Sequence, residues 1–380
     1  MKKKMALAAS ALAALGMGAA GPVSAAQTSV TLYGLLDMGL GYERVRAPGF
    51  KQSRIGAVQG VNSGSRFGLR GVEDLGDGLR ALFTLEGGIT PLNGKSAQSG
   101  RLFGRQATLG LADDAWGQLE LGRQTNVASK YFSGPIDPFS GSFNLANMGT
   151  TFSATNTLRY DNLVLYQSPV WSGFQFGLGY SFNADDTRTD TNGQQTGYAT
   201  GNNNRALTTG ARYVNGPLTL VTTYDRFNPT NDARGGKSNA RIQEWIVGGA
   251  YDFDVIKVGA AWGQTRDGWL QGASMGVSPD SNFRNAATFA LADGFRANSY
   301  QLNATVPLGK SKVMTSWQHA TANNATLTGD DAAINIYSVA YTYDLSPRTN
   351  LYAYAAYADN FSFRRGVSDT ALAAGIRHRF

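Results

Sequence analysis

The last ten residues alternate strictly between two kinds of side chain, and the alternation continues to an aromatic residue at the final position. A period of two is typical of a β-strand with two unlike faces. Chain ends usually fray in water, whereas the last strand of a closed barrel pairs with the first and leaves no edge. We therefore expect Phe380 in an aromatic belt at a membrane interface, with Arg377 and Arg379 facing water inside. One parity consists of Leu372, Ala374, Ile376, His378 and Phe380, and the other of Ala371, Ala373, Gly375, Arg377 and Arg379.

Similar alternation recurs along the whole chain and predicts sixteen strands. An even number of strands suits a closed antiparallel sheet. The predicted strands are Val30 to Tyr42, Arg66 to Val72, Leu79 to Glu86, Phe103 to Leu111, Gln118 to Arg123, Leu158 to Gln167, Gly173 to Phe182, Leu207 to Val214, Leu218 to Arg226, Glu244 to Phe253, Lys257 to Gly263, Ser299 to Val306, Lys312 to Ala320, Ile334 to Asp344, Leu351 to Ala358 and Thr370 to Phe380.

The connections between these strands alternate between short and long. Tight turns rich in Gly, Asn, Asp and Pro are predicted at 73–78, 113–117, 215–217 and 345–350, and long polar loops at 183–205, 228–241 and 267–298. Short turns at one end and long loops at the other are typical of barrels of the outer-membrane type. A soluble β-sandwich, whose strands also alternate, is the alternative.

The first 26 residues have the regions of an export signal. Three lysines at 2–4 precede an apolar run from Met5 to about Ala20, and Ser24-Ala25-Ala26 precedes Gln27. The alternative is a short membrane anchor, but the run is below the ~20 residues that a spanning helix needs. We expect cleavage after residue 26 and a single barrel over residues 27–380.

Composition excludes several other classes of protein. Without the three leader lysines, 34 Lys and Arg become 31, an excess of four over the 27 acidic residues, and no basic block suggests nucleic-acid binding. The absence of cysteine excludes disulfides and cysteine-ligated metals. We expect no metal and no cofactor. The chain has 17 tyrosines and 19 phenylalanines but only 16% charged residues, a composition that fits a barrel in an outer membrane.

Six short motifs resemble general diffusion porins of Gram-negative outer membranes, of the kind found in beta-proteobacteria such as Neisseria, Bordetella and Burkholderia. They follow one another in family-like order across the chain, which makes the set specific although each motif alone is weak. The motifs are Ser29-Val30-Thr31-Leu32-Tyr33-Gly34, Ser65 to Gly76, Leu102-Phe103-Gly104-Arg105-Gln106-Ala107, Leu121-Gly122-Arg123-Gln124, Asp137-Pro138-Phe139 and Arg377-His378-Arg379-Phe380.

The resemblance implies an all-β, 16-stranded antiparallel transmembrane barrel, usually a homotrimer, in the outer membrane. Such proteins are passive channels for ions and small hydrophilic solutes, and they are not enzymes. The sequence departs from the pattern at Pro347, where related porins often carry lysine, and the outer loops cannot be matched.

In this family the third outer loop folds into the barrel and narrows it. The longest stretch without clear alternation in the first half of the chain is 124–157. A loop of that length inside a compact domain is usually functional, so we expect it to be the constriction loop. An ordinary surface loop is the alternative.

Alternation also suggests which charged residues face the water-filled interior. Charge on the lipid face costs ~2 to 4 kcal/mol at the midplane, so we expect Glu86 and Arg80 to oppose Phe83 and Leu85. By the same argument, further inward candidates are Arg66, Arg70, Arg159 and Asp161.

Two more residues come from the resemblance alone. Arg105 shares parity with Phe103 and Leu109, so alternation does not place it inside, and Asp137 would be the acid presented by the third loop. The expected constriction is Arg66, Arg105 and Arg159 against Glu86 and Asp137. Three positive charges against two negative charges predict a mild anion preference. The alternative for each arginine is an ordinary solvated residue of the barrel wall.

Two other classes remain as alternatives, an outer-membrane barrel enzyme of the lipase or protease type and a surface adhesin. Gly272-Ala273-Ser274-Met275-Gly276 fits the pattern Gly-x-Ser-x-Gly, but this pattern needs a strand-to-helix turn and here falls in a predicted loop.

Arg123 has the parity of Leu119 and Leu121, which suggests an ion pair at a subunit contact.

Overall fold

The computed structural model describes residues 28–380 apart from 186–202, 231–239, 280–282 and 284. The predicted export signal, 1–26, therefore lies outside the described residues, as do the central parts of the predicted loops 183–205 and 228–241. Among the described residues, no helix has the length and apolar character needed to cross a membrane.

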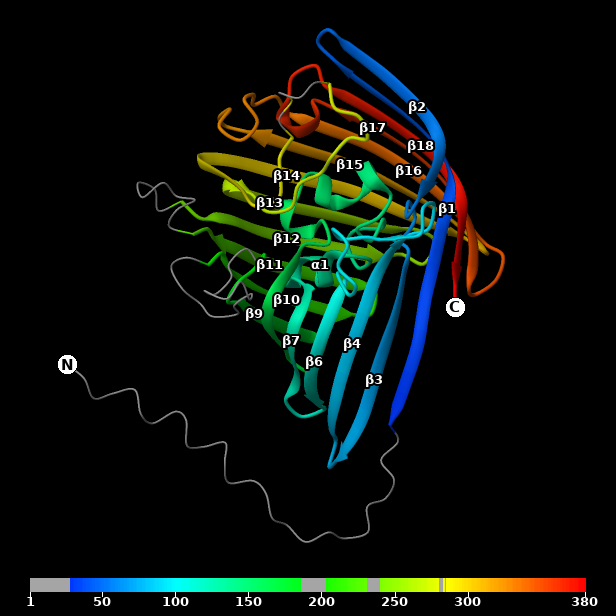
Figure 1. Cartoon of the computed structure of the whole chain (residues 1–380), viewed down its shortest axis with the longest axis vertical. Coiled ribbons are helices and arrows are strands. Elements are labelled where there is room, and N and C mark those ends of the chain that lie inside the picture. Colours follow the sequence, from blue (N-terminus) through cyan, green and yellow to red (C-terminus); the bar gives the residue numbers. More distant parts are fainter. Residues whose placement is uncertain (1–27, 186–202, 231–239, 280–282, 284) are drawn as a thin grey trace, which may run out of the picture.

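Antiparallel strands make up almost all of the regular structure (Figure 1). The strands are β1 (Ser29–Ala47), β2 (Phe50–Gln59), β3 (Arg66–Gly76), β4 (Leu79–Thr90), β5 (Lys95–Ser96), β6 (Gln106–Asp113), β7 (Gly117–Thr125), β8 (Arg159–Gln167), β9 (Phe174–Ser181), β10 (Arg205–Asn215), β11 (Leu218–Asn228), β12 (Ile242–Asp252), β13 (Lys257–Trp269), β14 (Ala290–Leu308), β15 (Ser311–Ala322), β16 (Ile334–Asp344), β17 (Thr349–Asp359) and β18 (Ser368–Arg379). One α-helix, α1 (Val127–Phe132), and four 3-10 helices, η1 (Asn144–Ala146), η2 (Met148–Thr150), η3 (Ser153–Thr155) and η4 (Phe361–Phe363), complete the described elements.

The sheet closes because β1 pairs antiparallel with β18 over a register that runs from Leu35 opposite Arg379 to Arg46 opposite Ser368. The first strand also pairs with β3 through its first half and with β2 through its second half. β2 and β3 therefore act as one wall strand interrupted at 60–65, and β5 pairs only with the end of β4. The barrel wall thus has the sixteen strands predicted from the sequence. Figure 1 shows β1 beside β18.

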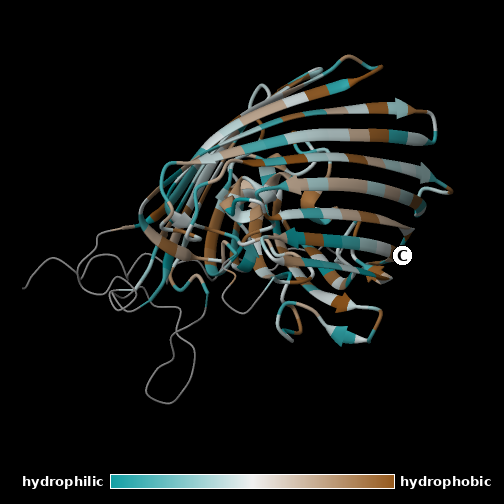
Figure 2. Cartoon of the chain, turned by 90° about the horizontal axis from the view of Figure 1, so that it is seen from above, coloured by the Kyte–Doolittle hydropathy of each residue, from teal (hydrophilic) through white to brown (hydrophobic). Residues whose placement is uncertain are grey.

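Strand β16 illustrates how alternation sorts side chains between the two faces of the wall. Tyr337, Val339, Tyr341 and Tyr343 are exposed on one face, whereas Ser338 and Thr342 are buried on the other. Figure 2 shows hydrophilic and hydrophobic segments succeeding one another along the strands. Alternation on this strand thus gives an aromatic outward face and a small, polar inward face. Short turns such as 309–310 and 345–348 lie at one end of the barrel, the short-turn end, and longer connections lie at the other.

The connection between β7 and β8, residues 126–158, folds into the barrel and is called loop 3 below. It contains α1 and η1 to η3. Its contacts reach strands on the far side of the interior: Thr151 donates to Gln318 of β15 (2.8 Å), Ser299 of β14 donates to the Thr151 carbonyl (2.6 Å), and Ser153 donates to Glu244 of β12 (2.8 Å). The predicted inward fold of this segment is therefore confirmed.

The C-terminal residue fixes the closure of the barrel through its backbone. Phe380 N donates to Gly34 O (3.0 Å), and Gly34 N donates to Phe380 O (3.1 Å). A Cβ atom added at Gly34 would lie 2.4 Å from the Phe380 ring and 2.8 Å from the Arg66 carbonyl oxygen. Glycine is thus required at position 34 by the close approach of the last residue.

We predict that Gly34→Val impairs barrel closure, because two methyl groups would have to displace both the Phe380 ring and backbone. The expected result is a lower yield of heat-modifiable, folded barrel on refolding and a loss of about 2 kcal/mol or more in stability. Gly56→Val is the matched control, because a Cβ at Gly56 meets no atom within 4 Å. Equal yields for the two variants would contradict the role assigned to Gly34.

Candidate functional site

Two of the expected constriction arginines, Arg66 and Arg105, lie next to the expected acid, Glu86, on the barrel wall. Arg105 Nε lies 2.6 Å from Glu86 Oε1, and Arg66 Nη1 lies 3.8 Å from the same oxygen. The other oxygen, Oε2, accepts a hydrogen bond from the Tyr33 hydroxyl (3.0 Å). Glu86 comes from β4, Arg66 from the start of β3 and Tyr33 from β1, so three adjacent wall strands build the cluster.

Arg159 joins this group through the backbone. Its Nε donates to the Arg105 carbonyl (2.9 Å) and its Nη1 to the Thr157 carbonyl (3.0 Å). Arg66 Nε similarly donates to the Gly64 carbonyl (3.0 Å). These bonds fix the guanidinium groups while leaving Arg159 without a carboxylate partner among the described residues. We call Arg66, Arg105, Arg159 and Glu86 the arginine cluster, which carries a formal charge of +2.

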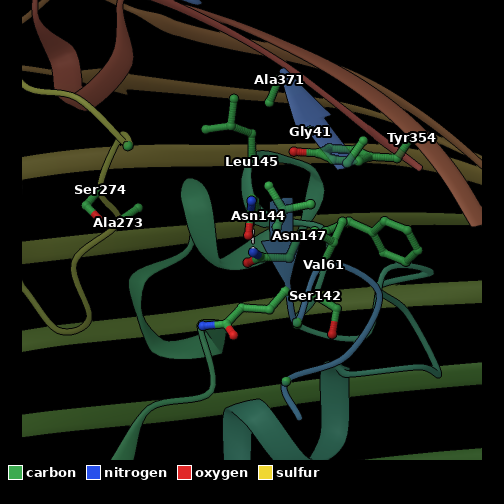
Figure 3. Close-up of a pocket in the computed structure, with 18 of the residues that line it drawn as sticks. Gly41, Val61, Ser142, Asn144, Leu145, Asn147, Ala273, Ser274, Tyr354 and Ala371 are labelled. Atoms are coloured by element: carbon green, nitrogen blue, oxygen red, sulfur yellow. Dashed lines mark hydrogen bonds between the residues drawn. The ribbon is translucent and has the colours of Figure 1, made fainter. Parts of the chain in front are cut away.

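The arginine cluster borders a cavity inside the barrel with a volume of about 920 Å³. All three arginines line it, whereas Glu86 does not. Figure 3 shows the loop 3 residues Asn144, Leu145 and Asn147 on one side of this cavity, with Ala273 and Ser274 approaching from another segment. A solute in the cavity therefore meets these three guanidinium groups, while Glu86 lies outside the lining. The carboxylates that do line the cavity are Glu43, which pairs with Arg54, and Asp369.

Arg105 reaches this cavity because it precedes the strand rather than belonging to it. Strand β6 begins at Gln106, and Arg105 lies in a bend that its backbone N–H ties to the Glu86 carbonyl (3.1 Å). The alternation of Phe103, Leu109 and Leu111 therefore does not govern its direction. The predicted strand from Phe103 starts three residues too early. This error explains why Arg105 has the parity of Phe103 and Leu109 and still reaches the cavity.

Asp137 is not brought to the arginine cluster, which corrects the expectation that loop 3 presents it to the solute path. Its side chain is 1% exposed. One oxygen accepts from Phe139 N (3.0 Å), and the other accepts from Gly141 N (3.0 Å) and Met148 N (3.3 Å). Asp137 therefore organises the inside of loop 3. Burial raises its pKa to about 6, against the opposing effect of the three backbone N–H groups.

Asp161 lies on the outward side of the wall, contrary to the expectation of an inward residue. The register between β7 and β8 shifts between Gly122 and Gln124, so that two β8 residues oppose Arg123 alone. Tyr160 consequently turns inward, where it stacks on Phe289. Asp161 instead binds Arg123, which follows Leu121 on the outward face, and Arg101 (2.8 Å to each oxygen).

The other two inward candidates lie away from the constriction. Arg80 forms an ion pair with Asp114 of the β6–β7 turn (2.6 Å), so it belongs to the short-turn end. Arg70 is exposed, and its guanidinium lies 5.4 Å from the centroid of the Tyr33 ring. Arg70 thus lies on the same side of the wall as Glu86 but does not contact it.

Sequence reasoning missed a second segment that enters the barrel mouth. Residues 270–279, which follow β13, include Gly272 to Gly276 in the cavity lining, and Gly276 N donates to Glu43 Oε1 (2.6 Å). Glu43 also pairs with Arg54 of β2 (2.5 Å). Strand β2 was not predicted, because residues 50–59 alternate poorly. The Gly-x-Ser-x-Gly pattern therefore lies in an irregular inward segment and not in a strand-to-helix turn.

Comparison with known proteins identifies the family. A family model described as Gram-negative porin matches residues 8–361. The chain belongs to the Gram-negative porin family. An outer membrane porin protein of Bordetella pertussis is 50% identical over 97% of this chain and 98% of its own length. Outer membrane porin protein 32 of Delftia acidovorans is 30% identical over 97% of this chain and 99% of its own length. A solved anion-selective porin from Comamonas acidovorans has a TM-score of 0.70 and 26% identity, with 93% of this chain and all of that chain covered.

The porin is thus a passive diffusion channel that crosses the outer membrane as a β-barrel. The short-turn end of the barrel is the periplasmic end in such proteins, and the long loops lie outside. In the part of the chain that the structure describes, no group of three or more His, Asp or Glu side chains could hold a metal ion.

Proposed function

We propose that this porin prefers anions and that the arginine cluster sets the preference. The observation that carries the proposal is the excess of positive charge around the cavity: Arg66, Arg105 and Arg159 line it and Glu86 does not. The other charged residues of the lining are Arg54 and Glu43, which pair with each other, and Asp369. Fixed charges that ring a narrow part of a pore select permeant ions by sign. The cluster's charge of +2 lowers the energy of an anion there and raises that of a cation.

Loop 3 supports this proposal by confining the path. Gln318 of β15 donates to the carbonyls of Ala146 and Asn147 (3.0 Å each), and Asn126 donates to Asp225 of β11 (2.8 Å). Loop 3 is therefore tied across the interior rather than hanging into it. We propose that loop 3 and the arginine cluster together form the constriction, and that permeant solutes are small hydrophilic ions.

We also propose that the porin works as a homotrimer. Arg101, Arg123 and Asp161 lie on the outward side of the wall, where charge against lipid would cost ~2 to 4 kcal/mol at the midplane. Asp161 is 5% exposed and accounts for only one of the two positive charges. A neighbouring subunit covering this part of the wall would keep these groups away from lipid.

No catalytic role is proposed. His319 stacks on Trp317, with ring centroids 5.7 Å apart, and His378 is hydrogen-bonded to Thr349. In the described part of the chain, Ser274 makes no hydrogen bond to either histidine; His319 contacts Asn335 instead. The side chains around the cavity therefore offer charge and polarity rather than an activated nucleophile.

The test is the current through the purified porin in a planar bilayer under a potassium chloride gradient. We expect a reversal potential shifted toward the equilibrium potential of chloride. We also expect conductance steps that close in threes. A reversal potential on the potassium side would overturn the anion preference and leave the channel standing. Steps that always close singly would overturn the trimer.

A further inference from the structure

A second, smaller cavity lies on the periplasmic side of loop 3, with a volume of about 480 Å³. Five cationic side chains line it, against one carboxylate, Asp344. Three of its walls are strands β15, β16 and β18, and the underside of loop 3 closes it at Pro138, Phe139 and Ser140. We call it the periplasmic basic chamber. Its cations are Arg66, Lys312, Arg348, Arg377 and Arg379.

The strand register explains why these charges gather at one height of the barrel. Arg377 of β18 pairs with Asn350 of β17, and Asn350 pairs with Asp344 of β16. Two residues back along β16, Thr342 pairs with Lys312 of β15. Inward positions on four adjacent strands therefore converge, although their sequence positions span more than sixty residues.

The positive charge of the chamber exceeds the charge of the one carboxylate, Asp344, that lines it. No ion pair joins Lys312, Arg348, Arg377 or Arg379 to a described carboxylate. Arg377 instead donates to neutral groups, Asn350 Oδ1 (2.8 Å) and Ser63 Oγ (2.9 Å). Lys312, Arg348 and Arg379 are exposed. Ammonium and guanidinium donors therefore face water in the chamber with their hydrogen-bonding capacity free.

Arg66 connects the chamber to the arginine cluster, because it lines both cavities. The two sets of cations therefore adjoin each other at Arg66. Several cations around one small volume favour an oxyanion with two negative charges over a monovalent anion, since the electrostatic energy scales with ligand charge and guanidinium forks match oxyanion geometry.

We propose that the periplasmic basic chamber is a second anion site, distinct from the constriction, that binds small doubly charged oxyanions such as inorganic phosphate. The inference rests on the proposed anion-conducting function. Its residues are Lys312, Arg348 and Arg379, with Arg377 as the fixed base of the site. Occupancy by a doubly charged oxyanion would hinder passage of chloride, so binding is measurable as partial block.

The experiment measures chloride current while phosphate is added at pH 8, with nitrate at equal ionic strength as the monovalent comparison. The expected result is a reduction of chloride conductance by phosphate but not by nitrate. Lys312→Gln combined with Arg379→Gln should raise the half-blocking phosphate concentration about tenfold, through the loss of two nearby charges. Lys310→Gln is the matched control, because Lys310 lies in the adjacent β14–β15 turn and does not line the chamber.

An unchanged half-blocking concentration in the double variant would overturn the proposal, because the block would then arise at the arginine cluster. Equal effects of phosphate and nitrate in the wild type would overturn it too. If the double variant fails to fold, Arg348→Gln in the exposed β16–β17 turn provides the same test with an effect of several-fold. Absence of current, or a cation-selective wild type, would instead overturn the proposed function.

Discussion

Replacement of Arg66, Arg105 and Arg159 together by alanine will reverse the ion preference of the porin. The formal charge of the arginine cluster changes from +2 to −1, because Glu86 remains. At an effective dielectric constant of about 20 and screened by physiological salt, each lost charge contributes on the order of 1 kcal/mol to the energy of an ion at the constriction. We expect the reversal potential to move from the chloride side to the potassium side and the conductance per step to increase.

Arg80→Ala is the matched control for the triple variant. Arg80 is also an inward candidate from the same strand as Glu86, but it pairs with Asp114 at the periplasmic turn. Its removal should leave the sign of the reversal potential unchanged. Both variants should keep the heat-modifiable mobility of the folded barrel. A triple variant that folds and still prefers anions would show that other charges, such as those of the periplasmic basic chamber, set the selectivity.

Asp137→Ala will loosen loop 3 and widen the channel. The carboxylate accepts hydrogen bonds from three backbone N–H groups, and its loss leaves all three without an acceptor in a buried loop. Each unsatisfied buried donor costs about 1 to 3 kcal/mol. We expect larger and noisier conductance steps, measured in single-channel records, while the barrel itself remains folded because loop 3 contributes no wall strand.

Acidity provides an independent test of the same residue. Burial raises the pKa of Asp137 to about 6, above its ordinary value of 3.8. The protonated form is therefore favoured in the folded loop, and its contribution to stability is fully present below pH 4 and is lost as the pH rises through 6. The expected size is about 3 kcal/mol for two pKa units. Motion of loop 3 should therefore increase between pH 4 and pH 7, and with it the noise of the single-channel current.

Asp137→Asn is the control for this pH dependence. Asparagine cannot ionise, so the change in noise between pH 4 and pH 7 should disappear even if the loop is less stable overall. If the variant keeps the full pH dependence, another group is responsible and the role assigned to Asp137 is wrong.

The sequence predicted the barrel because alternation is a local property of each strand. The tyrosines at 337, 341 and 343 face outward for a reason that neighbouring residues alone supply: side chains on a strand point to opposite faces in turn. The terminal Phe380 predicted closure for a similar reason, because an ordered last strand needs a partner. Glu86 and Arg66 followed from the same rule and from the cost of placing charge against lipid.

Local rules failed where the backbone departs from regular strand geometry. The register shift opposite Arg123 turned Tyr160 inward and Asp161 outward. Arg105 reached the cavity because strand β6 begins only after it, at Gln106. Residues 60–65, which interrupt a wall strand, and the inward segment after β13 left no periodic signal. Each of these features depends on what lies across the barrel rather than beside it in the chain.

Period and parity are local properties of the chain. They were therefore enough to predict the class of fold, the two faces of the wall and most members of the arginine cluster. Other placements could be seen only in the folded barrel: Asp137 is buried within loop 3, Glu86 lies outside the cavity lining that the arginines join, and Lys312, Arg348 and Arg379 converge on the periplasmic side. These placements follow from the register of adjacent strands and the path of a folded loop, which bring together residues that no local pattern relates.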